Sequence, residues 1–242
     1  MNSNHMEHQK DNQIAFPDLE LVFVEGGSFT MGDNESKYNF EKPAHQVAVA
    51  SFYMGRYPVT QRLWQAVMDK NPSMFQGEMR PVEQVSWDDA QVFIEQLNAV
   101  TGKTFRLPTE AQWEYAARGG KYSQGYTFAG SDKLKQVGWY DENSNGETHD
   151  VGLLLANELD IYDLSGNVRE WCEDDYHPNY EGAPKDGSAW IDTPRGEGRV
   201  LRGGSNFHKA LHCRSTFRRR YHPADRRSNF GFRLVLPFQS VG

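Results

Sequence analysis

The alternation of apolar and polar positions predicts several short strands. Residues 19–25 form a largely apolar run that stops at Gly26-Gly27, as expected for a strand that ends in a turn. A strand pair is expected at 28–31 and 46–54, where Val, Ala, Phe and Tyr alternate with polar neighbours. Two more strands are expected at 200–202 and 230–236, and no long element is predicted between 121 and 200. Small sheets joined by much irregular chain follow from this pattern.

Helical periodicity appears at three places, each opened by a capping residue. Thr60 is expected to cap a first helix, and Ser86 with Asp89 and Thr109 with Gln112 have capping-box spacing. The side chains expected to face the core are Leu63, Trp64, Val67 and Met68 in the first helix, Ala90, Val92, Phe93 and Leu97 in the second, and Trp113, Tyr115, Ala116 and Ala117 in the third. Gly119-Gly120 is expected to end the third helix.

Composition adds that this α+β chain is rich in loops. Of 242 residues 22 are glycine, hydrophobic residues make up 38% and aromatic residues 13%, which favours aromatic clusters over a helical bundle. There is no internal repeat, so we expect a disordered lead-in at 1–16 and one domain at 17–242. No apolar run is long enough to span a membrane and no signal segment follows the start. We expect a cytoplasmic protein, or a surface or extracellular one if a leader has been removed. The two cysteines, Cys172 and Cys213, are expected to be unpaired.

Charge sets the end of the chain apart from the rest. Residues 201–242 hold nine basic residues and one acid, Asp225, whereas residues 1–200 hold 17 basic and 32 acidic residues. Within this region residues 206–230, which we call the basic segment, are crowded with Arg, His, Phe and Tyr. An acidic body with one basic, aromatic region is typical of a scaffold that presents a surface. Phosphate contacts and base stacking by Arg218-Arg219-Arg220 are a weaker alternative, because the chain is acidic overall and has no nucleic-acid-binding motif.

Six stretches of the chain, in collinear order over about 20–237, resemble the formylglycine-generating enzyme-like (sulfatase-modifying factor) family. They are FVEGGSFTMG at 23–32, YPVT at 57–60, PVEQVSW at 81–87, RLPTEAQWEYAAR at 106–118, DLSGNVREW at 163–171, and RGGS at 202–205 with GFRL at 231–234. The resemblance implies an elaborated C-type-lectin-like fold with small antiparallel sheets, two main helices and much irregular chain. Fold alone does not decide function.

The oxidase members of this family hold copper with two cysteines five positions apart, in the segment after Arg-Gly-Gly-Ser. Cys213 stands at the second of these positions in this chain, but His208 stands at the first. Two soft thiolates suit copper, so the resemblance leaves the site incomplete. A copper-dependent oxidase that acts on a thiol through Cys213 and His208 remains the alternative function. Cys213 as a small buried residue is the simpler interpretation.

Non-catalytic members, the variable proteins of diversity-generating retroelements, use the same segment as a ligand-binding surface. Mutagenesis of Asn codons there cannot produce Lys, Glu, Gln, Met or Trp, and only Lys209 of the basic segment belongs to that set. At ordinary usage about five such residues would be expected. Our leading hypothesis is therefore a non-enzymatic module that binds a protein or another anionic or aromatic surface. A structural subunit of a larger assembly is a weaker third interpretation.

The residue types of the basic segment support binding independently of the resemblance, because rigid rings supply contact area while Arg and His supply hydrogen-bond donors. The residues predicted to bind the ligand are Asn206, Phe207, His208, Lys209, Leu211, His212, Phe217, Arg219, Tyr221, His222 and Arg226. We expect about half of the segment to be framework. In that interpretation Arg214 and Arg233 pair with acids of the body, and Phe232 packs in the core.

Acidic residues after the Gly-Asn motif suggest a calcium site. Asn167 and Glu170, followed by Glu173-Asp174-Asp175, could supply several oxygens at once. A salt-bridged acidic loop explains the same residues.

Overall fold

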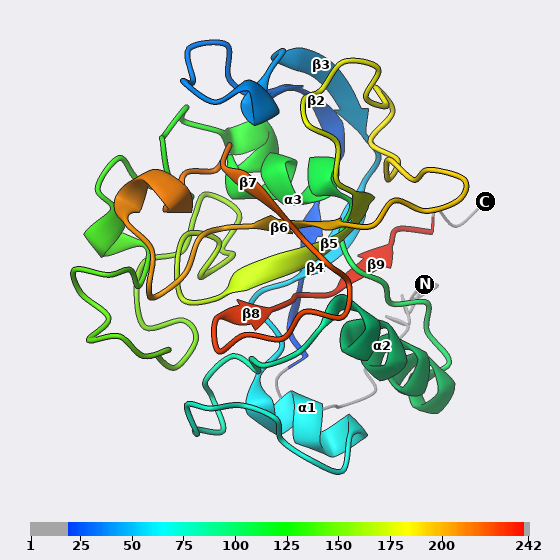
Figure 1. Cartoon of the computed structure of the whole chain (residues 1–242), viewed down its shortest axis with the longest axis vertical. Coiled ribbons are helices and arrows are strands. Elements are labelled where there is room, and N and C mark those ends of the chain that lie inside the picture. Colours follow the sequence, from blue (N-terminus) through cyan, green and yellow to red (C-terminus); the bar gives the residue numbers. More distant parts are fainter. Residues whose placement is uncertain (1–18, 240–242) are drawn as a thin grey trace, which may run out of the picture.

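The computed structural model describes residues 19–239, and the lead-in predicted at 1–16 lies outside this range. Within it, three small sheets and three α-helices are joined by long irregular connections (Figure 1). This is the α+β architecture that the sequence predicts. None of the helices in this range is long and apolar enough to cross a membrane.

The three sheets differ in strand order and in the direction of their strands. The antiparallel first sheet has the order β1 (Leu21–Val24), β4 (Phe52–Gly55), β9 (Val235–Pro237). The second is a ladder of β2 (Gly27–Met31) and β3 (His45–Val49). The third has the order β7 (Arg218–Tyr221), β6 (Arg199–Arg202), β5 (Arg169–Asp175), β8 (Phe230–Gly231), with β8 parallel to β5.

The predicted strands at 46–54 and 230–236 are each divided between two sheets. The first divides at Ala50-Ser51, where β3 ends and the chain enters β4. Gly26 lies directly against this point, since a Cβ atom there would be 2.5 Å from the carbonyl oxygen of Val49. Two backbones therefore approach closely at the point where the chain changes sheets, and only glycine leaves room for this.

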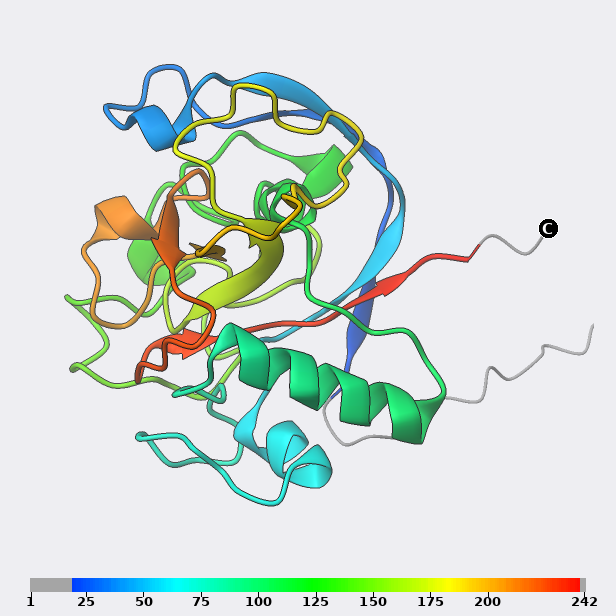
Figure 2. The same ribbon diagram turned by 45° about the vertical axis from the view of Figure 1, so that its right-hand side comes forward.

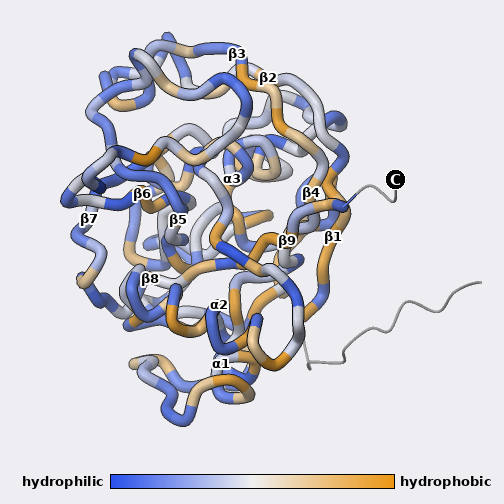
Figure 3. Tube along the Cα trace, turned by 90° about the vertical axis from the view of Figure 1, so that its right-hand side faces the viewer, coloured by the Kyte–Doolittle hydropathy of each residue, from blue (hydrophilic) through white to orange (hydrophobic). Residues whose placement is uncertain are grey.

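The absence of a long element between 121 and 200 is a wrong prediction, because β5 lies there. Its sequence, Arg-Glu-Trp-Cys-Glu-Asp-Asp, is mostly charged, yet β5 is a central strand and nearly all of it is buried. β7, inside the basic segment, was missed for the same reason. Figure 3 shows β7 as hydrophilic and β1 as hydrophobic, so hydropathy alone identifies only the second kind of strand.

The three predicted helices are confirmed, together with their caps. They are α1 (Gln61–Val67), α2 (Trp87–Thr101) and α3 (Glu110–Ala117). Thr60 accepts a hydrogen bond from the backbone of Leu63, and both capping boxes are formed. One predicted core residue is wrong: Val92 is exposed, and Ile94 is buried instead.

Two hydrophobic cores lie on opposite faces of β5 and β6. Successive residues of a strand point to opposite faces, so Cys172 and Val200 join the core that holds α3 and the β2–β3 ladder. Trp171 and Leu201 join the core that holds α1 and α2. In Figure 2, α2 runs below β5 and α3 lies above it. This arrangement makes β5 and β6 the centre of the fold and places the loop after β6 at its edge.

One buried carboxyl in this framework predicts an unusual pH dependence. Glu83 is buried, its Oε1 accepts a hydrogen bond from the backbone of Phe75 at 2.7 Å, and its Oε2 has no partner among the described residues. Burial raises the pKa of Glu83 to about 7, against the opposing effect of the backbone hydrogen bonds.

The folded protein should hold a proton at Glu83 that the unfolded chain releases. Its contribution to stability is therefore complete below the ordinary Glu pKa and is lost as the pH rises to about 7. Relative to Glu83→Gln, the wild type should lose on the order of 1–2 kcal/mol of unfolding free energy between pH 5 and pH 8. Urea unfolding at both pH values measures this. Glu95→Gln, the same change at an exposed position of α2, should give a smaller effect. The prediction would be contradicted if the unfolding free energies of the wild type and Glu83→Gln differed by the same amount at both pH values.

Candidate functional site

The basic segment connects β6 to β8. It contains the 3-10 helix Ala210–Cys213 and strand β7, which pairs with β6. In Figures 1 and 2 this helix and β9 lie on opposite sides of the molecule. The segment thus occupies one edge of the central sheet.

A buried ion network underlies the basic segment. Arg218 donates to both oxygens of Glu110 at 2.7 Å, and Arg202 contacts Glu110 at 3.1 Å and Glu114 at 2.6 Å. All four side chains are buried. Burial alone would raise the pKa of Glu114, but Arg118 and Arg202 hold it below its usual value. Arg202, just before the basic segment, and Arg218, within it, are therefore tied to α3 by charge-assisted hydrogen bonds.

The predicted framework residues are confirmed. Arg214 bonds to both oxygens of Glu41, at 3.0 and 2.6 Å, and Arg233 bonds to both oxygens of Glu170, at 2.6 and 2.7 Å. Phe232 is fully buried. Much of the basic charge is thus neutralised inside the fold.

Two of the predicted binding residues are buried and cannot reach a ligand from these positions. Asn206 has no exposed surface, and its backbone oxygen accepts a hydrogen bond from Ser144 at 2.7 Å. Phe217 packs edge-on against the rings of Tyr38 and Phe40. The local pattern could not show this, because the partners come from distant parts of the chain.

The other predicted binding residues retain accessible surface. Phe207, Lys209, Leu211, His222 and Arg226 are exposed. The half-buried members are His208, His212, Arg219 and Tyr221. An aromatic, an aliphatic and several basic side chains of this segment are thus accessible, although Arg226 pairs with both oxygens of Asp89 at 2.7 Å.

The copper alternative requires a donor set at His208 and Cys213. His208 Nδ1 lies 2.5 Å from the hydroxyl oxygen of Ser205, and burial lowers the pKa of His208 to about 3. Burial raises the pKa of Cys213 to about 12, so the thiol is protonated at neutral pH and a poor ligand. Within residues 19–239 there is no group of three or more His, Cys, Asp or Glu side chains that could hold a metal. This pair does not fit a copper ion.

The predicted calcium ligands are occupied by protein groups. Glu170 Oε2 accepts from Trp113 at 2.7 Å, and both of its oxygens accept from Arg233. Asn167 exchanges hydrogen bonds with the backbone of His149 at 3.1 and 3.0 Å. The salt-bridge interpretation describes these acids better, and the calcium site does not fit.

Sequence reasoning missed Arg169, which begins β5 and lies beneath the basic segment. Burial lowers the pKa of Arg169 to about 10, and its guanidinium lies 5.9 Å from the ring centre of Tyr221. Arg169 and Arg219 both depress the pKa of His208 and of His212, after the larger effect of burial. These side chains therefore lie in one region, in which Arg169 and Arg219 carry positive charge and the low pKa of His208 keeps its imidazole neutral at pH 7. No local signal identifies Arg169, because its surroundings depend on the fold of residues 205–221.

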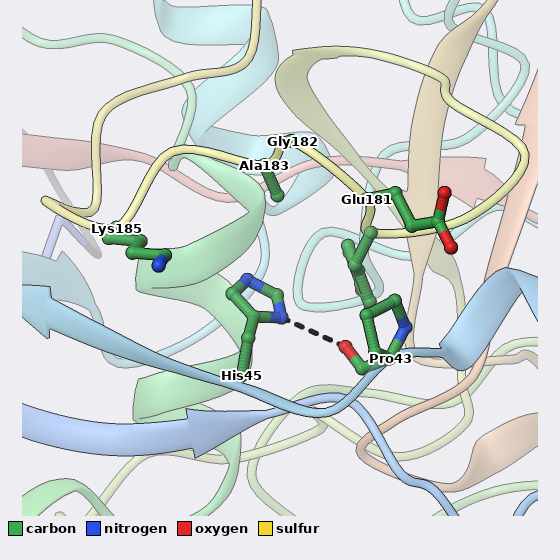
Figure 4. A pocket seen from close by; sticks show the side chains of 7 residues that line it. Pro43, His45, Glu181, Gly182, Ala183 and Lys185 are labelled. Carbon is green, nitrogen blue, oxygen red and sulfur yellow. Dashed lines mark hydrogen bonds between the residues drawn. The ribbon is translucent and has the colours of Figure 1, made fainter.

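A pocket on the described surface lies elsewhere. It has a volume of about 430 Å³ and is lined by Pro43, His45, Tyr180, Glu181, Gly182, Ala183 and Lys185. Figure 4 shows that the His45 side chain bonds to the backbone of Pro43 beside the 181–185 loop, at a distance of 3.1 Å. None of the predicted binding residues lines this pocket, so the basic segment presents a surface and not the lining of this pocket.

Known proteins with similar sequences have diverse names. "Chaperone protein LppX" of Paenibacillus barcinonensis is 36% identical over 76% of this chain and 78% of its own length. "Serine/threonine-protein kinase Pkn1" of Chlamydia trachomatis is 29% identical over 96% of this chain, which spans only 41% of that protein. "Formylglycine-generating enzyme" of Streptomyces coelicolor is 36% identical over 62% of this chain and 48% of its own length.

Two solved structures share the fold over nearly the whole chain. They are "Treponema denticola variable protein 1" and PvdO from Pseudomonas aeruginosa, each with a TM-score of 0.81 and 30% identity over 90% of this chain and 94% of the other. The family model "Sulfatase-modifying factor enzyme 1-like domain" matches residues 7–237. The chain therefore belongs to the sulfatase-modifying factor, or formylglycine-generating enzyme-like, family.

Proposed function

We propose that this chain is a non-enzymatic module that binds a protein ligand through the basic segment. The observation that carries the proposal is the division of that segment into two sets of residues. Arg214, Arg218 and Phe217 are held in the body of the fold, whereas Phe207 and Leu211 are 47% and 37% exposed. Large apolar side chains on a firmly anchored loop are typical of binding sites.

Neighbouring apolar residues extend this surface. The rings of Phe207 and Phe75 lie 6.2 Å apart, and Met74 beside Phe75 is exposed. The proposed binding face thus joins the basic segment to the 73–76 loop. Lys209, two positions after Phe207, is exposed and adds positive charge, which favours an acidic partner.

The likeness to a structure named as a variable protein supports this proposal, as does the near absence of Lys, Glu, Gln, Met and Trp from the segment. Diversification of the segment by a retroelement is a further part of the proposal. A neighbouring reverse transcriptase gene, with a near-copy of the coding segment that differs at adenines, would support it. The oxidase alternative is weaker because His208 and Cys213 do not fit copper.

For the test, a protein ligand is first captured with the wild-type chain and then purified. Combined Phe207→Ala and Leu211→Ala substitution should weaken its binding about tenfold or more, because truncation of central apolar anchors removes most of their contact. Calorimetric titration measures the affinity.

The matched control replaces Phe238, just after β9, and Val100, near the end of α2, which are 43% and 64% exposed. Alanine at these two positions should leave the affinity nearly unchanged. Equal binding by the Phe207→Ala, Leu211→Ala variant and the wild type would refute the proposed face. The oxidase would instead be favoured if the wild type consumed oxygen in the presence of a thiol peptide and Cys213→Ala abolished that consumption.

A further inference from the structure

Arg169 differs from the other buried arginines of the described chain in its electrostatic surroundings. The other four each contact a carboxylate: Arg199 with Asp175 at 2.7 Å, Arg202 with Glu114 at 2.6 Å, Arg218 with Glu110 at 2.7 Å and Arg233 with Glu170 at 2.6 Å. Arg169 is only 3% exposed, yet no carboxylate in residues 19–239 lies within salt-bridge distance of it. A buried charge without a counter-charge destabilises a fold, so its presence requires a physical reason.

After burial, the groups that influence Arg169 most include a second guanidinium, that of Arg219, and no carboxylate. The largest electrostatic influences on it come from Tyr221, which also hydrogen-bonds to it, then from Arg219 and Cys213. Arg219 itself lies over the rings of Phe40 and Phe217, at 5.3 and 5.0 Å, and not against an acid. Two guanidinium groups, Arg169 buried and Arg219 half-buried, therefore lie in one region, and neither pairs with a carboxylate of residues 19–239.

A second observation points to the same region. The Nδ1 atom of His212 is buried and has no hydrogen-bond partner among the described residues. The ring of His212 lies 5.4 Å from that of His208, and both side chains interact with Arg169 and Arg219. Arg214 and Asp141 are the other charged groups that act on His212. An unpartnered buried nitrogen beside two arginines is suited to donate to an acceptor from a ligand.

We propose that Arg169, Arg219 and His212 bind an oxyanion, either a carboxylate or a phosphate, that the ligand of the basic segment presents. This proposal rests on the proposed function, since it names the group by which that ligand is recognised. A guanidinium presents two parallel N–H donors to such a group, and a neutral imidazole adds a third. The bound anion supplies the counter-charge that the protein itself withholds from Arg169.

The test measures binding of small anions to the full chain in the absence of any partner. Sodium phosphate and sodium acetate are titrated separately, each against sodium chloride at the same ionic strength, and the thermal midpoint is recorded. A saturable rise with at least one of them is expected, because ligands that bind only the folded state raise its stability. A rise with acetate identifies a carboxylate site, and a rise with phosphate alone identifies a phosphate site.

Substitutions then locate the anion. Arg169→Met should weaken binding about tenfold or more, because it removes the bidentate donor. It should still fold, since no acid loses its partner and only the hydrogen bond to Tyr221 is removed. Arg219→Met provides the same test on a half-buried side chain. The matched control Arg220→Met removes an exposed charge from the adjacent position, and should change the affinity by no more than about twofold.

The outcomes separate this proposal from the proposed function. Absence of saturable binding by both anions, or equal binding by Arg169→Met and the wild type, would overturn the oxyanion site. Loss of anion binding in Arg169→Met, with partner binding unaffected by the Phe207→Ala and Leu211→Ala changes, would support the oxyanion site and refute the proposed face.

Discussion

Glu110→Gln is expected to lower the free energy of unfolding by about 3–5 kcal/mol, as measured for buried ion pairs that lose one partner. Glu110 is buried and receives hydrogen bonds from Arg218 and Arg202, while Tyr180 donates to the same carboxylate at 3.2 Å. The amide of glutamine cannot accept all these bonds and carries no charge. Arg218 would then remain buried without a counter-charge.

Urea unfolding at neutral pH measures the effect of Glu110→Gln. Glu197→Gln is the matched control, because Glu197 pairs with Arg220 at 3.1 Å where both side chains are exposed. That control should stay within about 0.5 kcal/mol of the wild type. A small loss for Glu110→Gln would show that the network beneath the basic segment contributes little to stability. It would also remove the argument that this segment is anchored.

Gly166→Ala is expected to cost about 4 kcal/mol or more, and expression of soluble protein should fall with it. The backbone at Gly166 has a φ of +95°, which alanine rarely adopts. A Cβ atom there would also lie 2.2 Å from the carbonyl oxygen of Trp139, a backbone atom that cannot move alone. Gly166 precedes Asn167, whose backbone oxygen accepts from Asn206, so the strain would reach the start of the basic segment.

Gly182→Ala separates the two causes, because Gly182 has a φ of +82° and nothing within 4 Å of an added Cβ. It should lower the free energy of unfolding by only about 1–2 kcal/mol, the effect of placing alanine in the left-handed conformation. Chemical unfolding of both variants gives the comparison. Similar losses for the two would mean that the backbone contact with Trp139 relaxes easily, contrary to this prediction.

Parts of the candidate site could be predicted from the sequence because they follow from simple pairing rules. A basic region in an acidic body must neutralise some of its arginines, and in residues 201–242 Arg214 and Arg233 do pair with Glu41 and Glu170. The exposed positions Phe207 and Leu211 were also predicted. The burial of Asn206 and Phe217 could not be, since their contacts come from residues that are distant in the sequence.

Sequence by itself determined the helix starts at Thr60, Ser86 and Thr109, because a cap and the residue it bonds are three positions apart. It also determined the family, through six local motifs. Tertiary structure alone decided that charged β5 is a central strand and that Arg169 is buried without an acid. Burial of charge depends on counter-charges elsewhere in the chain. Glu110 and Arg218, for example, are 108 residues apart, beyond the range of any local pattern.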